Sequence, residues 1–227
     1  MIGAVPRSVE FFLDPMCPWA YQTSRWIREV RDQTGLEVTW RFFSLEEVNR
    51  AEGKKHPWER EWSYGWSLMR VGAWLRRRDQ SLLDRWYDTV GAALHDRGEQ
   101  PHRREVAEQL AADAGLPAKA VAAAIDDPTT TDEVRADHEW LASTHAGYGV
   151  PTLVFPDGRP LFGPVIVPAP TGEAALRLWD VVTGWLEFPH LYEMRTPKTT
   201  QDWEHIQGQF QPYLDARSWQ TIQRPIA

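Results

Sequence analysis

The chain has 227 residues, 42% of them hydrophobic, which is enough for a buried core in one domain with an insertion or in two small domains. Its net charge of −7 argues against binding to a nucleic-acid backbone, which requires clustered Lys and Arg. No stretch approaches the roughly 20 apolar residues of a membrane span, and the N-terminus lacks a signal-peptide core, so we expect a cytoplasmic protein with no membrane partner.

The first part of the chain predicts a strand, a helix and a second strand. Residues 8–13 form an almost continuous apolar run, which is typical of a buried strand. Residues 17–34 carry a helical pattern that ends near Gly35, and residues 37–42 alternate with period two. We therefore expect a strand, a helix and a parallel strand in this order.

The middle of the chain, residues 58–147, has a helical pattern with repeated breaks. The breaks fall at residues 98–101, 115–117 and 126–128, where Gly or Pro occurs. We interpret this block as an all-helical insertion.

Short strands are expected again after this block. Residues 152–155 and 160–162 are mainly apolar, and the Pro-Asp-Gly-Arg sequence at 156–159 between them is typical of a hairpin turn. A last long helix is expected from Thr171 through Trp185.

The region after residue 187 is less regular. Trp203, Ile206 and Phe210 fall on one helical face. This spacing predicts a C-terminal helix that docks on the rest of the protein.

The single cysteine, Cys17, lies between the first predicted strand and the first predicted helix. Pro18 suits the first turn of a helix because its missing N–H has no intrahelical partner there, so Cys17 falls at the N-cap. The free N–H groups and the helix dipole favour a thiolate, and such placement lowers a cysteine pKa from about 8.5 to within roughly 3.5–7.5. An isolated cysteine is more often buried and inert, but the strand, Cys, Pro, helix setting favours a reactive thiol.

Several cofactor classes have no motif in this sequence. One cysteine excludes an internal disulfide, and there is no HExxH, no CxxC pair and no other convincing spacing of metal ligands. A Walker loop and a GxGxxG loop are also missing. We therefore expect neither a metal nor a nucleotide cofactor.

Four sets of residues occur in an informative order. They are Phe11-Phe12-Leu13-Asp14-Pro15-Met16-Cys17-Pro18-Trp19, Thr23-Ser24-Arg25-Trp26, Gly149-Val150-Pro151-Thr152, and Phe162-Gly163-Pro164-Val165 followed by Glu173-Ala174-Ala175-Leu176-Arg177-Leu178-Trp179-Asp180. In order and spacing, over residues 8–197, they resemble the DsbA-like oxidoreductases of the thioredoxin superfamily. The resemblance is to the branch that contains the actinobacterial mycothiol-dependent nitroreductases.

The resemblance implies an α/β protein with a thioredoxin-like fold and an inserted all-helical domain. The thioredoxin-like domain is then discontinuous, with residues 1–57 and 148–197. Residues 58–147 form the helical insertion, and residues 198–227 form a C-terminal extension.

The resemblance also assigns roles around Cys17. It implies that Cys17 is the attacking thiol, that Pro151 is a cis-proline facing it, and that the Val150 backbone pairs with an extended thiol ligand. A proline directly before a strand is also a plausible cis position in its own right. Dithiol members of the family carry a cysteine where this chain has Ala20, so an external thiol must resolve the mixed disulfide.

Five residues are candidates for contact with the thiol or substrate: Pro18, Trp19, Val150, Trp66 and His95. Trp19 either covers the bound thiol or only completes the turn after Cys17. His95 ends a predicted helix, where a cation suits the helix dipole whatever the function. Trp66 lies in an aromatic stripe spaced at four residues, which is more often core but also suits a planar substrate.

These observations predict a thiol-dependent oxidoreductase in which Cys17 forms and exchanges mixed disulfides with a low-molecular-weight thiol. The resemblance identifies that thiol as mycothiol, implies an aromatic or disulfide substrate, and adds a homodimer as a further expectation. Two alternatives stay open. One is an enzyme like the kappa-class glutathione transferases and chromene-carboxylate isomerases, and the other is a non-catalytic thiol-binding module that keeps the fold.

Overall fold

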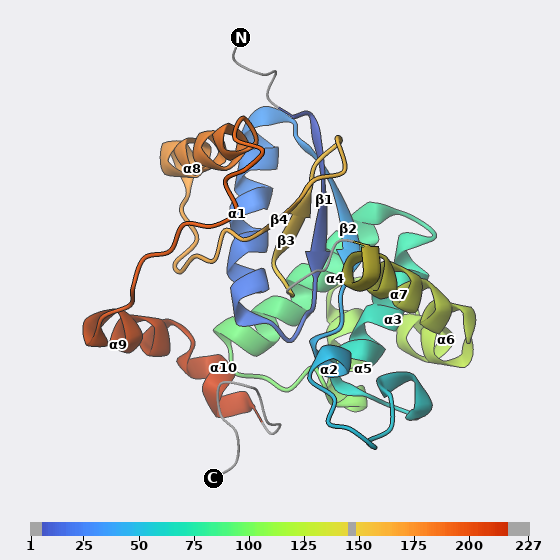
Figure 1. Ribbon diagram of the computed structural model, residues 1–227. Coiled ribbons are helices and arrows are strands. Elements are labelled where there is room, and N and C mark those ends of the chain that lie inside the picture. Colours follow the sequence, from blue (N-terminus) through green and yellow to red (C-terminus); the bar gives the residue numbers. More distant parts are fainter. Residues whose placement is uncertain (1–5, 145–148, 218–227) are drawn as a thin grey trace.

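The computed structural model describes residues 6–144 and 149–217, and Figure 1 shows their arrangement. The expected domain boundary between residues 147 and 148 lies outside the described residues, as do the expected domain ends within 1–5 and 218–227.

The elements of the described chain agree with the predicted strands and with the first and last long helices to within one residue at each end. The strands are β1 (Ser8–Leu13), β2 (Glu37–Phe42), β3 (Thr152–Val154) and β4 (Pro160–Phe162). The α-helices are α1 (Pro18–Thr34), α2 (Leu45–Val48), α3 (Tyr64–Arg76), α4 (Gln80–Gly91), α5 (Arg104–Asp113), α6 (Ala120–Asp126), α7 (Thr129–Glu139), α8 (Gly172–Trp185), α9 (Thr200–Gln209) and α10 (Gln211–Ala216). A 3-10 turn, η1 (Pro57–Glu59), and two π-helical turns, η2 (Ala92–Asp96) and η3 (Trp140–Thr144), complete them.

The strands form one sheet in the order β2-β1-β3-β4. β1 and β2 are parallel, with Phe11 opposite Trp40, because α1 carries the chain back along the sheet between them. β3 is antiparallel to β1, and β4 is antiparallel to β3. The turn between β3 and β4 contains Gly158 at φ 82°, a conformation that glycine adopts without strain. The predicted hairpin is therefore confirmed.

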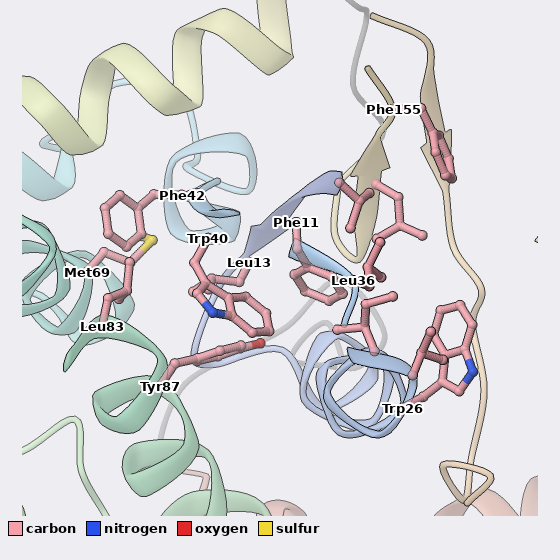
Figure 2. Close-up of a cluster of buried hydrophobic side chains, with 14 of the residues drawn as sticks. Phe11, Leu13, Trp26, Leu36, Trp40, Phe42, Met69, Leu83, Tyr87 and Phe155 are labelled. Carbon is pink, nitrogen blue, oxygen red and sulfur yellow. The ribbon is translucent and has the colours of Figure 1, made fainter. Parts of the chain in front are cut away.

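Successive residues of β1 face opposite layers, as the pleat of a strand requires. Phe11 belongs to the largest core cluster, which Figure 2 shows together with Trp26 of α1 and Trp40 of β2. Phe12 belongs to a different cluster and stacks on Trp140 at a ring-centroid distance of 5.6 Å. Both faces of the central strand are therefore buried, which explains its apolar run.

Helices alone make up the described part of the middle block, from α3 to η3, between β2 and β3. Asp137 of α7 ties this block to the sheet, because its carboxylate accepts hydrogen bonds from Arg41 Nε at 2.8 Å and from the Phe42 N–H at 3.2 Å, both on β2. The same carboxylate also accepts from Arg76 Nη1 of α3 at 2.5 Å. The all-helical character is confirmed, while the exact domain limits stay a prediction.

Two short helices, α9 and α10, replace the single C-terminal helix that the sequence predicted. Pro212 lies in the first turn of α10, where it starts a new helix because it has no N–H to continue the old one. Ile206 and Phe210 are buried as predicted, but Trp203 is 50% exposed. Trp203 instead lies beside Lys198, whose Nζ is 5.5 Å from its ring centroid. The docked face therefore begins at Ile206.

Candidate functional site

Cys17 occupies the N-cap of α1, as predicted from Pro18. Its backbone is extended, with φ −92° and ψ 113°, and its Sγ accepts a hydrogen bond from the Ala20 N–H at 3.4 Å. Ala20 therefore contributes a backbone donor at the position where a dithiol enzyme carries its second sulfur. The thiol points into the end of the helix, where backbone N–H groups without intrahelical partners gather.

The predicted lowering of the Cys17 pKa is wrong for this arrangement. Only 5% of the residue is exposed, and this burial raises the pKa of the thiol to about 12. The Ala20 N–H acts in the opposite direction, and the charge of Asp14 adds to the increase. The cost of placing a thiolate in an apolar surrounding therefore exceeds the stabilisation that the helix terminus offers.

The loop before β3 lies against the sulfur. The Val150–Pro151 peptide bond is cis, as predicted, and the Cys17 thiol donates to the Val150 carbonyl oxygen at a sulfur–oxygen distance of 3.6 Å. Two further cis bonds, Gly163–Pro164 and Val167–Pro168, were not predicted. Cys17, Val150 and Pro151 thus form one cluster, although 133 positions separate the sulfur from Val150 in the chain.

His95 contacts the cysteine loop, which is the segment of residues 14–17 between β1 and α1. Its Nε2 bonds to the Pro15 carbonyl oxygen at 2.9 Å, and because a carbonyl only accepts, Nε2 carries the proton. Burial lowers the pKa of His95 to about 4, so the ring is neutral at pH 7 and the expected cation at a helix end is wrong. Its Nδ1 has no hydrogen-bond partner among the described residues. His95 belongs to the π-helical turn η2, and turns of this kind occur frequently at functional sites.

Trp19 lies at the outer side of the cysteine loop and is half-buried. Its ring meets that of Phe210 edge-on, at a centroid distance of 4.8 Å. Tyr213 of α10 lies 5.2 Å from His95 by the same measure. The sequence predicted Trp19 and His95 as site residues but missed Phe210 and Tyr213, because their place beside the cysteine loop depends on how the chain returns from α8.

Asp14 is a third residue near Cys17 that was not predicted from the sequence as part of the site. It is 1% exposed, and its two carboxylate oxygens accept from the Met16 N–H at 2.9 Å and the Leu45 N–H at 2.8 Å. Burial raises its pKa to about 7 despite these two donors. An acidic residue directly after a buried strand and three positions before a cysteine was the available signal.

Trp66 is not brought to this cluster. It is 1% exposed and packs in the large core cluster, with its ring 5.1 Å from that of Trp58. The structure therefore gives Trp66 a core position, and its contact with substrate stays a prediction.

The described residues contain no group of three or more His, Cys, Asp or Glu that could hold a metal ion. Within the same residues, no helix is both long enough and apolar enough to cross a membrane.

Comparison with known proteins identifies the family of this chain. A model of the Rv2466c-like family, described as mycothiol-dependent nitroreductase Rv2466c, matches residues 16–196. The chain belongs to the Rv2466c-like family. The protein Rv2286c of Mycobacterium tuberculosis, described as uncharacterized, is 58% identical to this chain over 217 residues. These residues cover 96% of this chain and 94% of that protein.

Solved structures agree with the thioredoxin-like fold of this Rv2466c-like protein. A probable DsbA oxidoreductase, SCO1869 from Streptomyces coelicolor, has a TM-score of 0.51 at 24% identity, with coverage of 85% of this chain and 92% of that one. A 2-hydroxychromene-2-carboxylate isomerase has a TM-score of 0.56 at 13% identity, with 79% and 95% coverage. The cytosolic disulfide reductase DsbM from Pseudomonas aeruginosa, in a structure with GSH, gives 0.52 at 17%, with 79% and 97% coverage. These similarities confirm the predicted fold class.

Proposed function

We propose that this protein is a thiol-dependent oxidoreductase in which Cys17 forms a mixed disulfide with a low-molecular-weight thiol, mycothiol. The observation that carries the proposal is the position of the Cys17 sulfur at the start of α1, against the loop of the cis Val150–Pro151 bond. Membership of a family described as mycothiol-dependent supports the choice of thiol. A reducing cytoplasm suits such exchange.

Exchange at a single cysteine takes two steps. The Cys17 thiolate attacks one sulfur of a small disulfide, so the S–S bond breaks, a Cys17–S bond forms, and the other half leaves as a thiolate. A second small thiolate then attacks the mixed disulfide, releases a new small disulfide and restores Cys17. Ala20 offers no sulfur for an internal second step, so the external thiol is obligatory.

Cys17 must lose its proton before it attacks, because the thiolate is the nucleophile. In the structure the Val150 carbonyl oxygen accepts a hydrogen bond from the Cys17 S–H group, and the Ala20 N–H already donates to the sulfur. The donor that stabilises the thiolate is therefore in place before ionisation. Burial is the largest cause of the raised pKa of Cys17, because it removes the water that would solvate the thiolate charge. The thiolate therefore becomes accessible when the surroundings of the sulfur change as a ligand enters.

The same chemistry extends to an aromatic nitro substrate, as the family description suggests. Reduction of a nitro group to a nitroso group takes two electrons and two protons and releases water. In the first step the Cys17 thiol and one mycothiol give up two electrons and two protons to the nitro group and join as the mixed disulfide. A second mycothiol then attacks this mixed disulfide, leaves as mycothiol disulfide and restores the Cys17 thiol, so mycothiol is the net reductant.

Intact-mass spectrometry of the purified protein tests the proposal. Incubation with mycothiol disulfide should add one mycothiol to the wild-type chain and none to Cys17→Ser. A turnover assay then follows mycothiol disulfide produced from mycothiol and an aromatic nitro compound. An adduct without disulfide production would favour a transferase or isomerase of the kappa type, and no adduct at all would leave a non-catalytic module.

A further inference from the structure

The C-terminal extension packs directly on the cysteine loop. Phe210, where α9 meets α10, holds the ring of Trp19 edge-on at 4.8 Å, and Tyr213 of α10 faces His95 at 5.2 Å. Met16, next to Cys17, shares one buried cluster with Phe210 and Tyr213. Figure 1 shows α10 below the start of α1, where the cysteine loop lies.

The extension and the start of α3 both pack on the cysteine loop, since Met16 shares one buried cluster with Leu68 of α3 and with Tyr213 of α10. Burial is the main cause that raises the pKa of Tyr213 to about 12, and a charge on Cys17 adds to the increase, so the phenol lies within electrostatic reach of the sulfur. Trp19 links the two groups, because it packs both against the cluster that contains Cys17 and against the one that contains Phe210. One side of the site is therefore built from residues beyond position 196, where the family match ends.

Among the described residues, the extension is docked through one buried face. It follows residues 187–199, which have no helix or strand and are exposed apart from Leu191. Its buried residues are Ile206, Phe210, Tyr213 and Ala216. Gln100 Nε2 also donates a hydrogen bond to the Ala216 carbonyl oxygen at 3.2 Å, which joins the end of α10 to the loop after η2. A segment near a chain end that is docked through one face after an exposed linker opens at a lower free-energy cost than the core elements.

A buried sulfur selects reagents by size. With Cys17 only 5% exposed, a small disulfide needs a local opening of the residues packed beside the sulfur, among which Trp19 contacts Phe210. A polypeptide must lay several residues beside the sulfur and needs a larger opening. The rate of thiol–disulfide exchange depends on access to the attacking sulfur. The larger partner therefore requires the extension to leave its position.

We propose that α9 and α10 form a displaceable wall of the Cys17 site, made chiefly by Phe210 and Tyr213, which admits small thiols and disulfides and excludes polypeptide disulfides. This inference rests on the proposed function, since it concerns which disulfides reach Cys17. In each exchange the Cys17 thiolate displaces a leaving thiolate from the probe and keeps the remaining half as a mixed disulfide, so no other oxidant or reductant is needed.

Two probes with the same leaving group test the wall. One is the pyridyl disulfide of N-acetylcysteine, and the other is the pyridyl disulfide of an unstructured peptide with one cysteine. Both release pyridine-2-thione, whose absorbance gives the rate, and Cys17 is the only cysteine in the chain. The ratio of the small-probe rate to the peptide-probe rate measures selection independently of the intrinsic reactivity of the thiol.

The full-length wild type should strongly prefer the small probe. Phe210→Ala/Tyr213→Ala should lower this ratio by about tenfold or more, because loss of a buried aromatic side chain shifts an opening equilibrium by at least that factor. Trp203→Ala, on the same extension but exposed, should keep the wild-type ratio. If circular dichroism shows the double variant to be unfolded, Phe210→Ala alone is measured, with a smaller decrease expected.

The possible outcomes distinguish failure of the displaceable wall from failure of the proposed function. An equal increase with both probes, an unchanged ratio, or a wild type without size preference overturns the wall while the proposed function stands. Failure of the small probe with native wild type, when the denatured chain reacts, overturns the proposed function instead.

Discussion

Cys17 is subject to two opposing physical effects at the start of α1. The Ala20 N–H and the helix terminus favour the thiolate, but the apolar surroundings remove the water that would otherwise solvate it. Burial is the larger effect, so the resting thiol is protonated at neutral pH. A protein of this design keeps its only thiol unreactive until a ligand or an opening changes the surroundings.

Alkylation by iodoacetamide should report this protonated state. The rate for native protein should increase with pH and show no plateau below about pH 9, because the pKa of Cys17 lies above that of a free cysteine. Intact mass gives the rate for a single adduct, since no other cysteine competes. The same chain in denaturant should level off near the ordinary cysteine value, and a native plateau below pH 8 would contradict the prediction.

Asp14 should make the protein less stable as the pH rises. Its folded pKa of about 7 exceeds the unfolded value near 3.8, so the folded state binds more protons between these limits. The free energy of unfolding of wild type, relative to Asp14→Asn, should fall by up to about 4 kcal/mol from pH 4 to pH 7.

The comparison with Asp14→Asn is needed because His95 acts in the opposite direction. Its pKa is lowered to about 4, so its contribution to stability is lost as the pH falls from 6.5. Urea unfolding at several pH values measures the difference, and His95→Gln serves as the control that removes the opposing slope. A wild-type minus Asp14→Asn difference that stays constant with pH would refute the role given to Asp14.

At the scale of elements, α1 and α4 approach each other at Gly91. A Cβ on Gly91 would lie 2.5 Å from Tyr21 Cδ2, and this ring cannot easily move because its hydroxyl donates to Asp96 at 2.6 Å and its face stacks on His95. Gly91→Ala should therefore lower the free energy of unfolding by roughly 1–3 kcal/mol, despite the better helix propensity of alanine.

Gly184 in α8 is the matched control, because nothing lies within 4 Å of a Cβ built there. Gly184→Ala should be neutral or stabilise the protein by up to about 1 kcal/mol. Thermal unfolding of both variants checks the pair, and equal effects would show that the close approach of α1 and α4 has no energetic consequence.

The place of α3 in the core gives a sharp expectation for Trp66. Trp66→Ala should cost roughly 3–5 kcal/mol of stability, because it removes a fully buried indole from the core around Trp58 and Met69. Urea unfolding measures this loss. Near-native stability combined with weaker substrate binding would instead assign Trp66 to a substrate wall.

Local patterns were sufficient to predict most elements of the thioredoxin-like part. The apolar run of β1, the N-cap at Cys17 and the turn at Gly158 each depend on residues close together in sequence, and the structure has all three. The π-helical turn η2 was not predictable in this way, because His95 is held by a carbonyl from the distant cysteine loop.

The same distinction explains the outcome at the site. The cis bond at Pro151 follows a sequence motif, whereas the burial of Cys17 depends on tertiary packing that no motif records. The thiol pKa was therefore predicted in the wrong direction, since the helix terminus is visible in sequence and the desolvation is not. Phe210 was expected to dock, but nothing local indicated that it would dock on Trp19.

At the scale of the whole molecule, the shared carboxylate of Asp137 makes the sheet and the helical block a single cooperative unit. Arg41, Phe42 and Arg76 all donate to this one carboxylate, so melting of the helical block takes one of the two carboxylate partners of Arg41 away and leaves it with Glu10. We expect wild type to show one calorimetric transition whose van't Hoff and calorimetric enthalpies agree. Asp137→Leu should cost about 3 kcal/mol or more and broaden or split that transition, whereas a single sharp peak in the variant would show that packing alone couples the two parts.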